Sequence, residues 1–211
     1  FKIANKNPLG SGAGYGSSFQ LNRSYTTQLL GFEDLNYNVI YAQMNRGKME
    51  RVVTQAMAGI AATLSKFAMD ATLYLNQNFG FISFPEALTT GSSIMPHKKN
   101  PDVLELIRAK CNKLQNLPLQ IQTLTNNLPS GYHRDLQIVK EDYLPAFDTL
   151  IDCLDMMCLM LNNIKIKDKI LEIEFKEFSE IAISTILPNE DLDFFSDLEG
   201  FERGILRAAL L

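Results

Sequence analysis

A proline-free stretch from Asn36 to Asn78 constrains the fold more than any other part of the sequence. Its apolar residues follow one another at steps of three and four, at Met49, Val53, Ala56, Ile60, Leu64, Phe67 and Ala71. This spacing is typical of a helix with one apolar face. A single helix of that length measures roughly 60 Å, which exceeds the width of a compact domain of this size. The stretch therefore predicts a helix bundle, in which copies of the same chain are the simplest neighbours.

Two further helical stretches follow, and no stretch has the alternating pattern of a strand. The first begins after Pro101 and is expected to bend at Pro118, because an interior proline removes one backbone hydrogen bond. The second covers residues 135–162 and contains Pro145 as its expected kink. The predicted class is all-α, a bundle of long helices.

The sequence divides into three parts. Residues 1–18 are rich in Gly, Ser, Asn and Pro and predict an irregular segment, residues 19–163 a central helical domain, and residues 164–211 a C-terminal helical segment. The glycines of the first part do not follow a hydrophobic strand or open a helix, as a phosphate-binding loop requires. We therefore interpret them as a connector that helps to assemble a nearby site.

Composition excludes several classes of protein. A net charge of −4 and a pI near 5.3 supply no basic surface for nucleic acid. The apolar stretches are interrupted before the roughly 18 residues that a membrane span needs, so we expect no membrane partner. Cys111, Cys153 and Cys158 form no Cys-x-x-Cys pair, which favours reduced buried thiols in a cytoplasmic protein over disulfides or a zinc site. The chain opens at Phe1 without a Met or a signal peptide, which predicts that its front has been removed or is not given.

The loop at residues 89–101 is the most unusual segment, because Gly91 to Pro101 reads Gly-Ser-Ser-Ile-Met-Pro-His-Lys-Lys-Asn-Pro. Asn100 before Pro101 predicts a capped helix start, and the acidic Asp102 and Glu105 suit the positive end of the helix dipole. Hydroxyl, ammonium and backbone N–H groups gathered at such a start can hold a carboxylate or a developing oxyanion. A solvated, well-capped loop is the alternative interpretation.

This loop resembles the signature Gly-Ser-Ser-x-x-Pro-x-Lys-x-Asn of the aspartase/fumarase superfamily, whose members eliminate fumarate from succinyl compounds. Its flanks resemble the argininosuccinate lyase family at residues 98–108, at 132–141 and in the Pro-Leu-Gly-x-Gly-Ala run at 8–13. The resemblance extends from residue 8 to about residue 164. It implies the long-helix bundle of that superfamily.

The resemblance also implies catalytic roles within the loop. Ser92 would be the base that removes a proton beside the succinyl carboxylate, with Ser93 as its substitute. Lys98 and Asn100 would bind that carboxylate and stabilise the dianionic intermediate, since proton removal adds a second negative charge. Glu105 would pair with a catalytic histidine, which in the family lies on an earlier segment that this chain lacks. A loop that closes over the substrate would exclude water.

Further along the chain, the resemblance implies that Tyr132, Gln137 and Lys140 hold the arginine end or the far carboxylates of the substrate. We expect neither His97 nor His133 to be the catalytic histidine. The resemblance implies a small-molecule substrate, no metal and no organic cofactor. It also implies a homotetramer in which segments of three subunits build each active site.

Three functional hypotheses remain open. The first is part of an argininosuccinate lyase of arginine biosynthesis, which splits argininosuccinate into arginine and fumarate by β-elimination. The second is a catalytically inactive helical module, since some relatives serve as lens proteins. The third is a lyase for another succinyl amine such as adenylosuccinate, against which the pair Lys98-Lys99 and the segment 132–140 argue.

Overall fold

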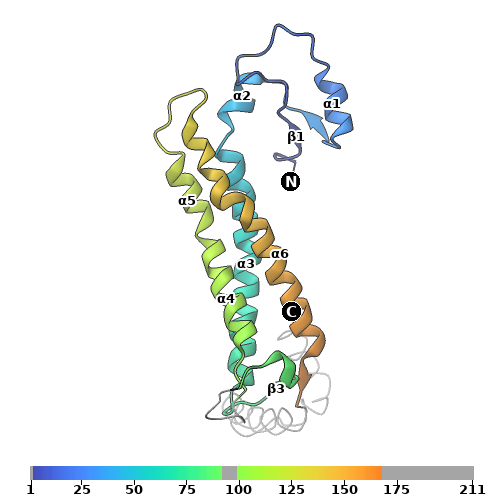
Figure 1. Cartoon of the computed structure of the whole chain (residues 1–211), viewed down its shortest axis with the longest axis vertical. Helices are drawn as coiled ribbons and strands as arrows, with labels where there is room; N and C mark the ends of the chain where they lie inside the picture. The colour runs from blue at the N-terminus through green and yellow to red at the C-terminus, as the bar shows by residue number, and fades with distance from the viewer. Residues whose placement is uncertain (1, 92–98, 168–211) are drawn as a thin grey trace, which may run out of the picture. The chain divides into compact units, whose positions relative to one another are not determined.

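The computed structural model describes residues 2–91 and 99–167, and the chain divides into the unit Phe1–Lys165 and a second unit that begins at Ile166 (Figure 1). The α-helices described are α1 (Arg23–Leu29), α2 (Val39–Met44), α3 (Lys48–Leu75), α4 (Asp102–Gln115), α5 (Leu117–Leu124) and α6 (Val139–Asn163). The strands are β1 (Lys6–Asn7), β2 (Asp34–Leu35), β3 (Ile82–Ser83) and β4 (Lys165–Ile166), and 3-10 turns lie at Glu86–Leu88 and Arg134–Gln137. The helix-rich architecture confirms the predicted all-α class.

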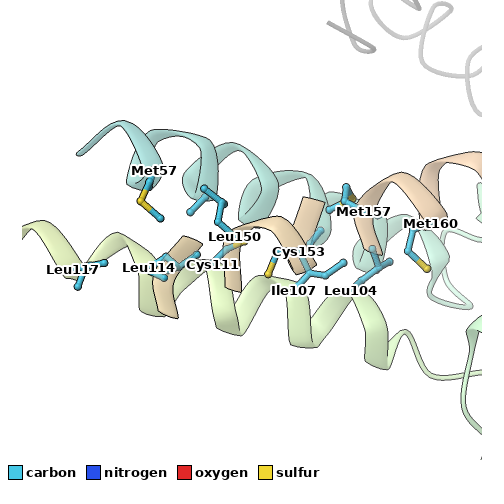
Figure 2. Close-up of a cluster of buried hydrophobic side chains, with 14 of the residues drawn as sticks. Met57, Leu104, Ile107, Cys111, Leu114, Leu117, Leu150, Cys153, Met157 and Met160 are labelled. Carbon is cyan, nitrogen blue, oxygen red and sulfur yellow. The ribbon is translucent and has the colours of Figure 1, made fainter. Parts of the chain in front are cut away.

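Four helices pack as a bundle in which α3 contacts α4, α5 and α6. The segment α4–α5 runs in the direction opposite to α3 and α6 (Figure 1). Buried side chains recur along these helices at steps of three and four, and Figure 2 shows them meeting between the ribbons. The centre of this core contains Met57, Ala61, Leu104, Ile107, Cys111, Leu114, Leu117, Ile121, Leu150, Cys153, Met157 and Met160.

The apolar stripe predicted for α3 packs inside the unit only in part, since Ala71 is buried and Val53 and Leu64 pack against the core. Ile60 and Phe67 are 45% and 37% exposed, whereas Met57 and Ala61 are buried. The core therefore also uses a neighbouring stripe, whose buried residues are Thr54, Met57, Ala61 and Ala68. As a result α3 has two apolar faces, and one of them remains open in the single chain.

The prediction of one continuous helix from Asn36 to Asn78 was wrong. The chain breaks between α2 and α3, where Gly47 has a φ of +79°. The Gly47 N–H donates to Oε2 of Glu50 at 2.6 Å, and this contact caps the start of α3. A side chain at position 47 would also press on Thr125, whose Cγ2 lies 2.5 Å from the site of an added Cβ. The 28 residues of α3 therefore span roughly 42 Å.

The other two helical stretches are present with shifted boundaries. The expected bend lies at Asn116, the one residue between the end of α4 at Gln115 and the start of α5 at Leu117. Pro118 lies in the first turn of α5, where its missing N–H costs nothing. The third stretch begins with the 3-10 turn Arg134–Gln137 before α6, which tolerates Pro145 in its interior.

Short strands correct the expectation that no strand would form. Lys6 pairs with Asp34 and Asn7 with Leu35 in a parallel two-stranded sheet. Arg23 fixes the same region, because its guanidinium donates to the carbonyl oxygens of Leu9 at 2.9 Å and Asn36 at 2.8 Å. Two-residue strands are too short to show an alternating pattern, so no periodicity could reveal them.

Helix α3 meets the length and hydropathy of a membrane-spanning helix, with an 18-residue window of mean hydropathy 1.2. This differs from the expectation that every apolar stretch would be interrupted earlier. Because α3 packs against α4, α5 and α6, its composition also suits the central helix of a bundle.

Candidate functional site

Part of the predicted catalytic loop lies outside the described residues. These positions are Ser92, Ser93, His97 and Lys98, and the structure describes the loop only at its two ends. The two ends meet, since Thr90 N–H donates to Asn100 O at 3.2 Å and Asn100 N–H donates to Thr90 O at 2.8 Å. The described residues therefore fix the base of the loop at the start of α4.

The prediction that Asn100 caps the start of α4 was wrong. Helix α4 begins at Asp102, and the side chain of Asn100 does not cap it, because the backbone of Asn100 is held by Thr90. The hydroxyl of Thr90 donates to the carboxylate of Asp102. Glu105 lies on the exposed face of the first turn of α4, where another segment can reach it.

The other group of predicted residues is brought together at the start of α6. Lys140 Nζ donates to Gln137 Oε1 at 2.7 Å, and Gln137 Nε2 donates to the Tyr132 hydroxyl at 3.3 Å. Tyr132 and Lys140 are exposed, and Gln137 is half-buried. Residues spread over one turn and one helix start thus form a single polar cluster, which presents an ammonium group and a phenol to solvent.

The loop base and this polar cluster lie at opposite ends of the bundle (Figure 1). Helices α4 and α5, with 14 and 8 residues, separate Asn100 from Tyr132 by roughly 33 Å of helix. A small substrate cannot contact both groups of one chain. If both groups act on one molecule, they must come from different copies.

A groove that no sequence pattern predicted includes Gly131, the residue before Tyr132 of the polar cluster. It has a volume of about 340 Å³ and is lined by Ala13, Gly14, Tyr15, Val39, Ile40, Gln43, Met44, Ser130 and Gly131. Gly14 has a φ of +89°, and an added Cβ there would lie 2.7 Å from Gln43 Cβ. The glycines of the first segment therefore let the chain pack tightly on α2. Gly14 was the one sequence feature that could have indicated this close packing, but the sequence does not show that its partner is Gln43.

The junction of α2 and α3 contains an ion pair beside unpartnered polar atoms. Arg46 Nε lies 3.1 Å from Glu50 Oε1, and Glu50 also caps Gly47. Among the described residues, Gln43 Nε2, Asn45 Oδ1 and Arg51 Nε are buried without a hydrogen-bond partner. Within residues 2–91 and 99–167, this junction therefore gathers several buried polar groups whose hydrogen-bonding capacity is not used.

The described part of the chain contains neither a cluster of metal ligands nor a histidine held as a base. Residues 2–91 and 99–167 contain no group of three His, Cys, Asp or Glu side chains that could hold a metal ion. His133 Nε2 lies 2.8 Å from the carbonyl oxygen of Pro129, so the imidazole is engaged with its own turn.

The cysteines differ in environment. Cys111 and Cys153 are buried, as predicted, whereas Cys158 is exposed, which corrects the prediction for that residue. Burial and the neighbouring Cys153 raise the pKa of the Cys111 thiol to about 12. Cys111 is therefore a neutral core side chain at physiological pH, and its thiolate is not available as a nucleophile.

Comparison with known proteins places this geometry beside enzymes of one chemical class. Residues 2–115 match a family model described as Lyase. The chain is 67% identical over 172 residues to the argininosuccinate lyase of Parabacteroides distasonis, an alignment that covers 82% of this chain and 39% of that protein. It is 66% identical over 172 residues to the argininosuccinate lyase of Bacteroides fragilis, covering 82% of this chain and 38% of that protein. The chain thus spans under two fifths of the length of these relatives.

A solved structure supports the same comparison at the level of the fold. A crystal structure of EDDS lyase in complex with formate superimposes with a TM-score of 0.67 and 25% sequence identity. That match covers 80% of this chain and 33% of the other. The long-helix arrangement of this chain is therefore similar to that of a lyase.

Proposed function

Since the chain belongs to the Lyase family, we propose that it is part of an argininosuccinate lyase, which splits argininosuccinate into arginine and fumarate. The observation that carries the proposal is the 67% identity to such an enzyme. The polar cluster formed by Tyr132, Gln137 and Lys140 supports it, because an ammonium group and a phenol suit the carboxylates of this substrate. Arginine biosynthesis in the cytoplasm is the corresponding cellular role.

The proposed reaction is a β-elimination. Ser92, or Ser93 in its place, takes a proton from the carbon beside a succinyl carboxylate, and Lys98 and Asn100 stabilise the negative charge that develops on that carboxylate. The carbon–nitrogen bond then breaks, and the leaving nitrogen takes up a proton. In this proposal Glu105, which is exposed on α4, orients a histidine from another segment that supplies or positions this proton. In this proposal no metal or organic cofactor takes part.

We further propose that the protein acts as a homotetramer with sites shared between copies. The roughly 33 Å of helix between Asn100 and Tyr132 supports shared sites. Exposed apolar residues support the assembly, since α6 leaves Phe147, Ile151, Leu154 and Leu161 at least 36% exposed on one stripe. Light scattering is expected to give a mass near four times the 23.8 kDa of one chain, and a clean monomer would contradict the proposal.

A fumarate-release assay tests the reaction. The chain is assayed alone and together with the part of the Parabacteroides distasonis enzyme that it does not span. We expect ultraviolet absorbance of fumarate only in the mixture and only with argininosuccinate. Fumarate release from adenylosuccinate, and not from argininosuccinate, would contradict the proposed substrate. An associated, folded mixture without any release would favour a helical module without catalytic activity.

A further inference from the structure

Two cysteines from different helices meet in the core of the bundle. Cys111 lies on α4 and is fully buried, and Cys153 lies on α6 with 2% of its surface exposed. Figure 2 shows both among the side chains that fill the space between these helices. The two thiols are close enough to share a hydrogen bond. Neither residue has a part in the proposed reaction.

The packing of α4 against α6 gives this pair a spacing that suits a disulfide. Packed helices lie about 8–10 Å apart between their axes, and each Cα atom lies about 2.3 Å from its own axis. Residues that face each other across such a contact can therefore have their Cα atoms within the roughly 4.4–6.8 Å that a disulfide spans. The contact between the Cys111 and Cys153 side chains shows that these two residues face each other.

The surroundings of the pair determine which oxidant suits it. The same core cluster contains Ile107, Leu114 and Met157, so the environment is apolar and disfavours a charged or bulky oxidant. Hydrogen peroxide is small and uncharged. Burial raises the pKa of the Cys111 thiol to about 12, so this thiol keeps its proton and Cys153 is assigned the first step of an oxidation.

We propose that Cys111 and Cys153 are a peroxide-sensitive pair, which closes to a disulfide that links α4 covalently to α6. The Cys153 sulfur attacks one oxygen of hydrogen peroxide, the O–O bond breaks, and the released hydroxide takes up the Cys153 proton and leaves as water. The Cys111 sulfur then attacks the sulfenic acid, the S–O bond breaks, and the Cys111 proton leaves with that hydroxide as a second water.

In this sequence of steps two thiols are oxidised to one disulfide and one peroxide is reduced to two waters. A thiol reductant reverses the link by thiol–disulfide exchange. The link closes the chain from α4 through α5 to α6, so it restricts the separation of these helices. The inference goes beyond the proposed lyase function and does not depend on it.

Prolonged peroxide treatment of the folded 211-residue chain with Cys158→Ala tests the inference. This substitution removes the exposed thiol, so that Cys111 and Cys153 are the only cysteines left. We expect the mass of the chain to fall by two hydrogen atoms, and peptide mapping without reductant to join the peptides of Cys111 and Cys153. Dithiothreitol should restore both thiols. Unreacted thiols, or oxygen added to either sulfur without a link, would overturn the inference.

Urea unfolding of the linked chain tests whether the native bundle holds the two cysteines at disulfide spacing. At the unfolding midpoint of the reduced chain, we expect the link to raise the folded-to-unfolded ratio at least roughly tenfold, because it restricts the unfolded state. An unchanged or lower ratio would show that the link distorts the bundle and would contradict the proposed geometry.

The matched control is the chain with Cys111→Ala and Cys158→Ala, treated with the same peroxide. It keeps Cys153 and every methionine but cannot form the link, so its folded-to-unfolded ratio should not rise. An equal rise in this control would assign the gain to another oxidation and would overturn the inference. Circular dichroism before and after treatment verifies that each variant is folded.

Discussion

At the scale of residues, the sequence of the loop predicted a chemical role for each side chain but not where those side chains lie. The serines and Lys98 fall outside the described residues, and Asn100 contributes its backbone to the base of the loop. Tyr132, Gln137 and Lys140 were predicted from the family segment alone, and their hydrogen bonds bring them together. Gln137 follows Tyr132 by five residues and precedes Lys140 by three, and this spacing alone did not predict that the side chains meet. The reason is that a 3-10 turn lies between Tyr132 and α6, where helical spacing does not apply.

Replacement of Ser92 by Ala separates the two candidate bases. In the complemented enzyme we expect turnover to fall by at least about a thousandfold, because no other group on the proposed reaction path removes the proton. Ser93→Ala is the matched control and should cost far less. A loss below tenfold for Ser92→Ala, with a large loss for Ser93→Ala, would transfer the role of base to Ser93.

The buried Cys111 thiol makes a pH-dependent contribution to stability. Its pKa is raised from 9.0 to about 12 in the folded chain, so the folded state holds the proton more tightly than the unfolded state. The free energy of unfolding is therefore unaffected below about pH 9 and falls as the pH rises from about 9 toward 12. Urea unfolding of the chain and of Cys111→Ala should show a steeper alkaline decline in the unsubstituted chain. Parallel declines would contradict this account.

At the scale of elements, periodicity located the helices but not their ends. The stretch from Asn36 to Asn78 reads as one helix because its apolar steps continue across position 47. The break arises from a positive φ at Gly47 and from close packing on Thr125, and neither is visible in a pattern of apolar residues. The same limit explains the core face of α3, since spacing shows that apolar stripes exist but not which stripe meets α4.

Two glycines of the same region test this account of the break. Gly47→Ala is expected to destabilise the chain by about 2 kcal/mol, because it combines a strained φ with a clash against Thr125. Gly59→Ala, inside α3 and with open space around it, is expected to stabilise by about 0.5–1 kcal/mol. Thermal unfolding of both variants measures the difference, and similar effects of the two substitutions would contradict the assigned role of Gly47.

At the scale of the whole molecule, the bundle keeps the two groups of the proposed site apart within one chain. The loop base at Asn100 and the cluster at Tyr132 are held apart by α4 and α5, and apolar stripes on α3 and α6 remain exposed. The sequence predicted additional neighbours from a helix of roughly 60 Å, but the break at Gly47 shortens α3 to roughly 42 Å. The expectation of further neighbours therefore now depends on the exposed apolar residues of α6 and not on helix length. The sequence could not show which segments of other copies complete the proposed site, because those segments meet this chain only in the assembly.

Mixing two inactive variants tests the central claim most directly. Ser92→Ala disables the loop end of each chain, and Lys140→Ala disables the cluster end, so each complemented variant alone should release almost no fumarate. After the two variants are unfolded together and reassembled, some sites combine an intact loop from one copy with an intact cluster from another. We predict that fumarate release reappears in the mixed assembly. Mixed assemblies, verified by mass spectrometry, that remain as inactive as either variant would contradict a site built between copies.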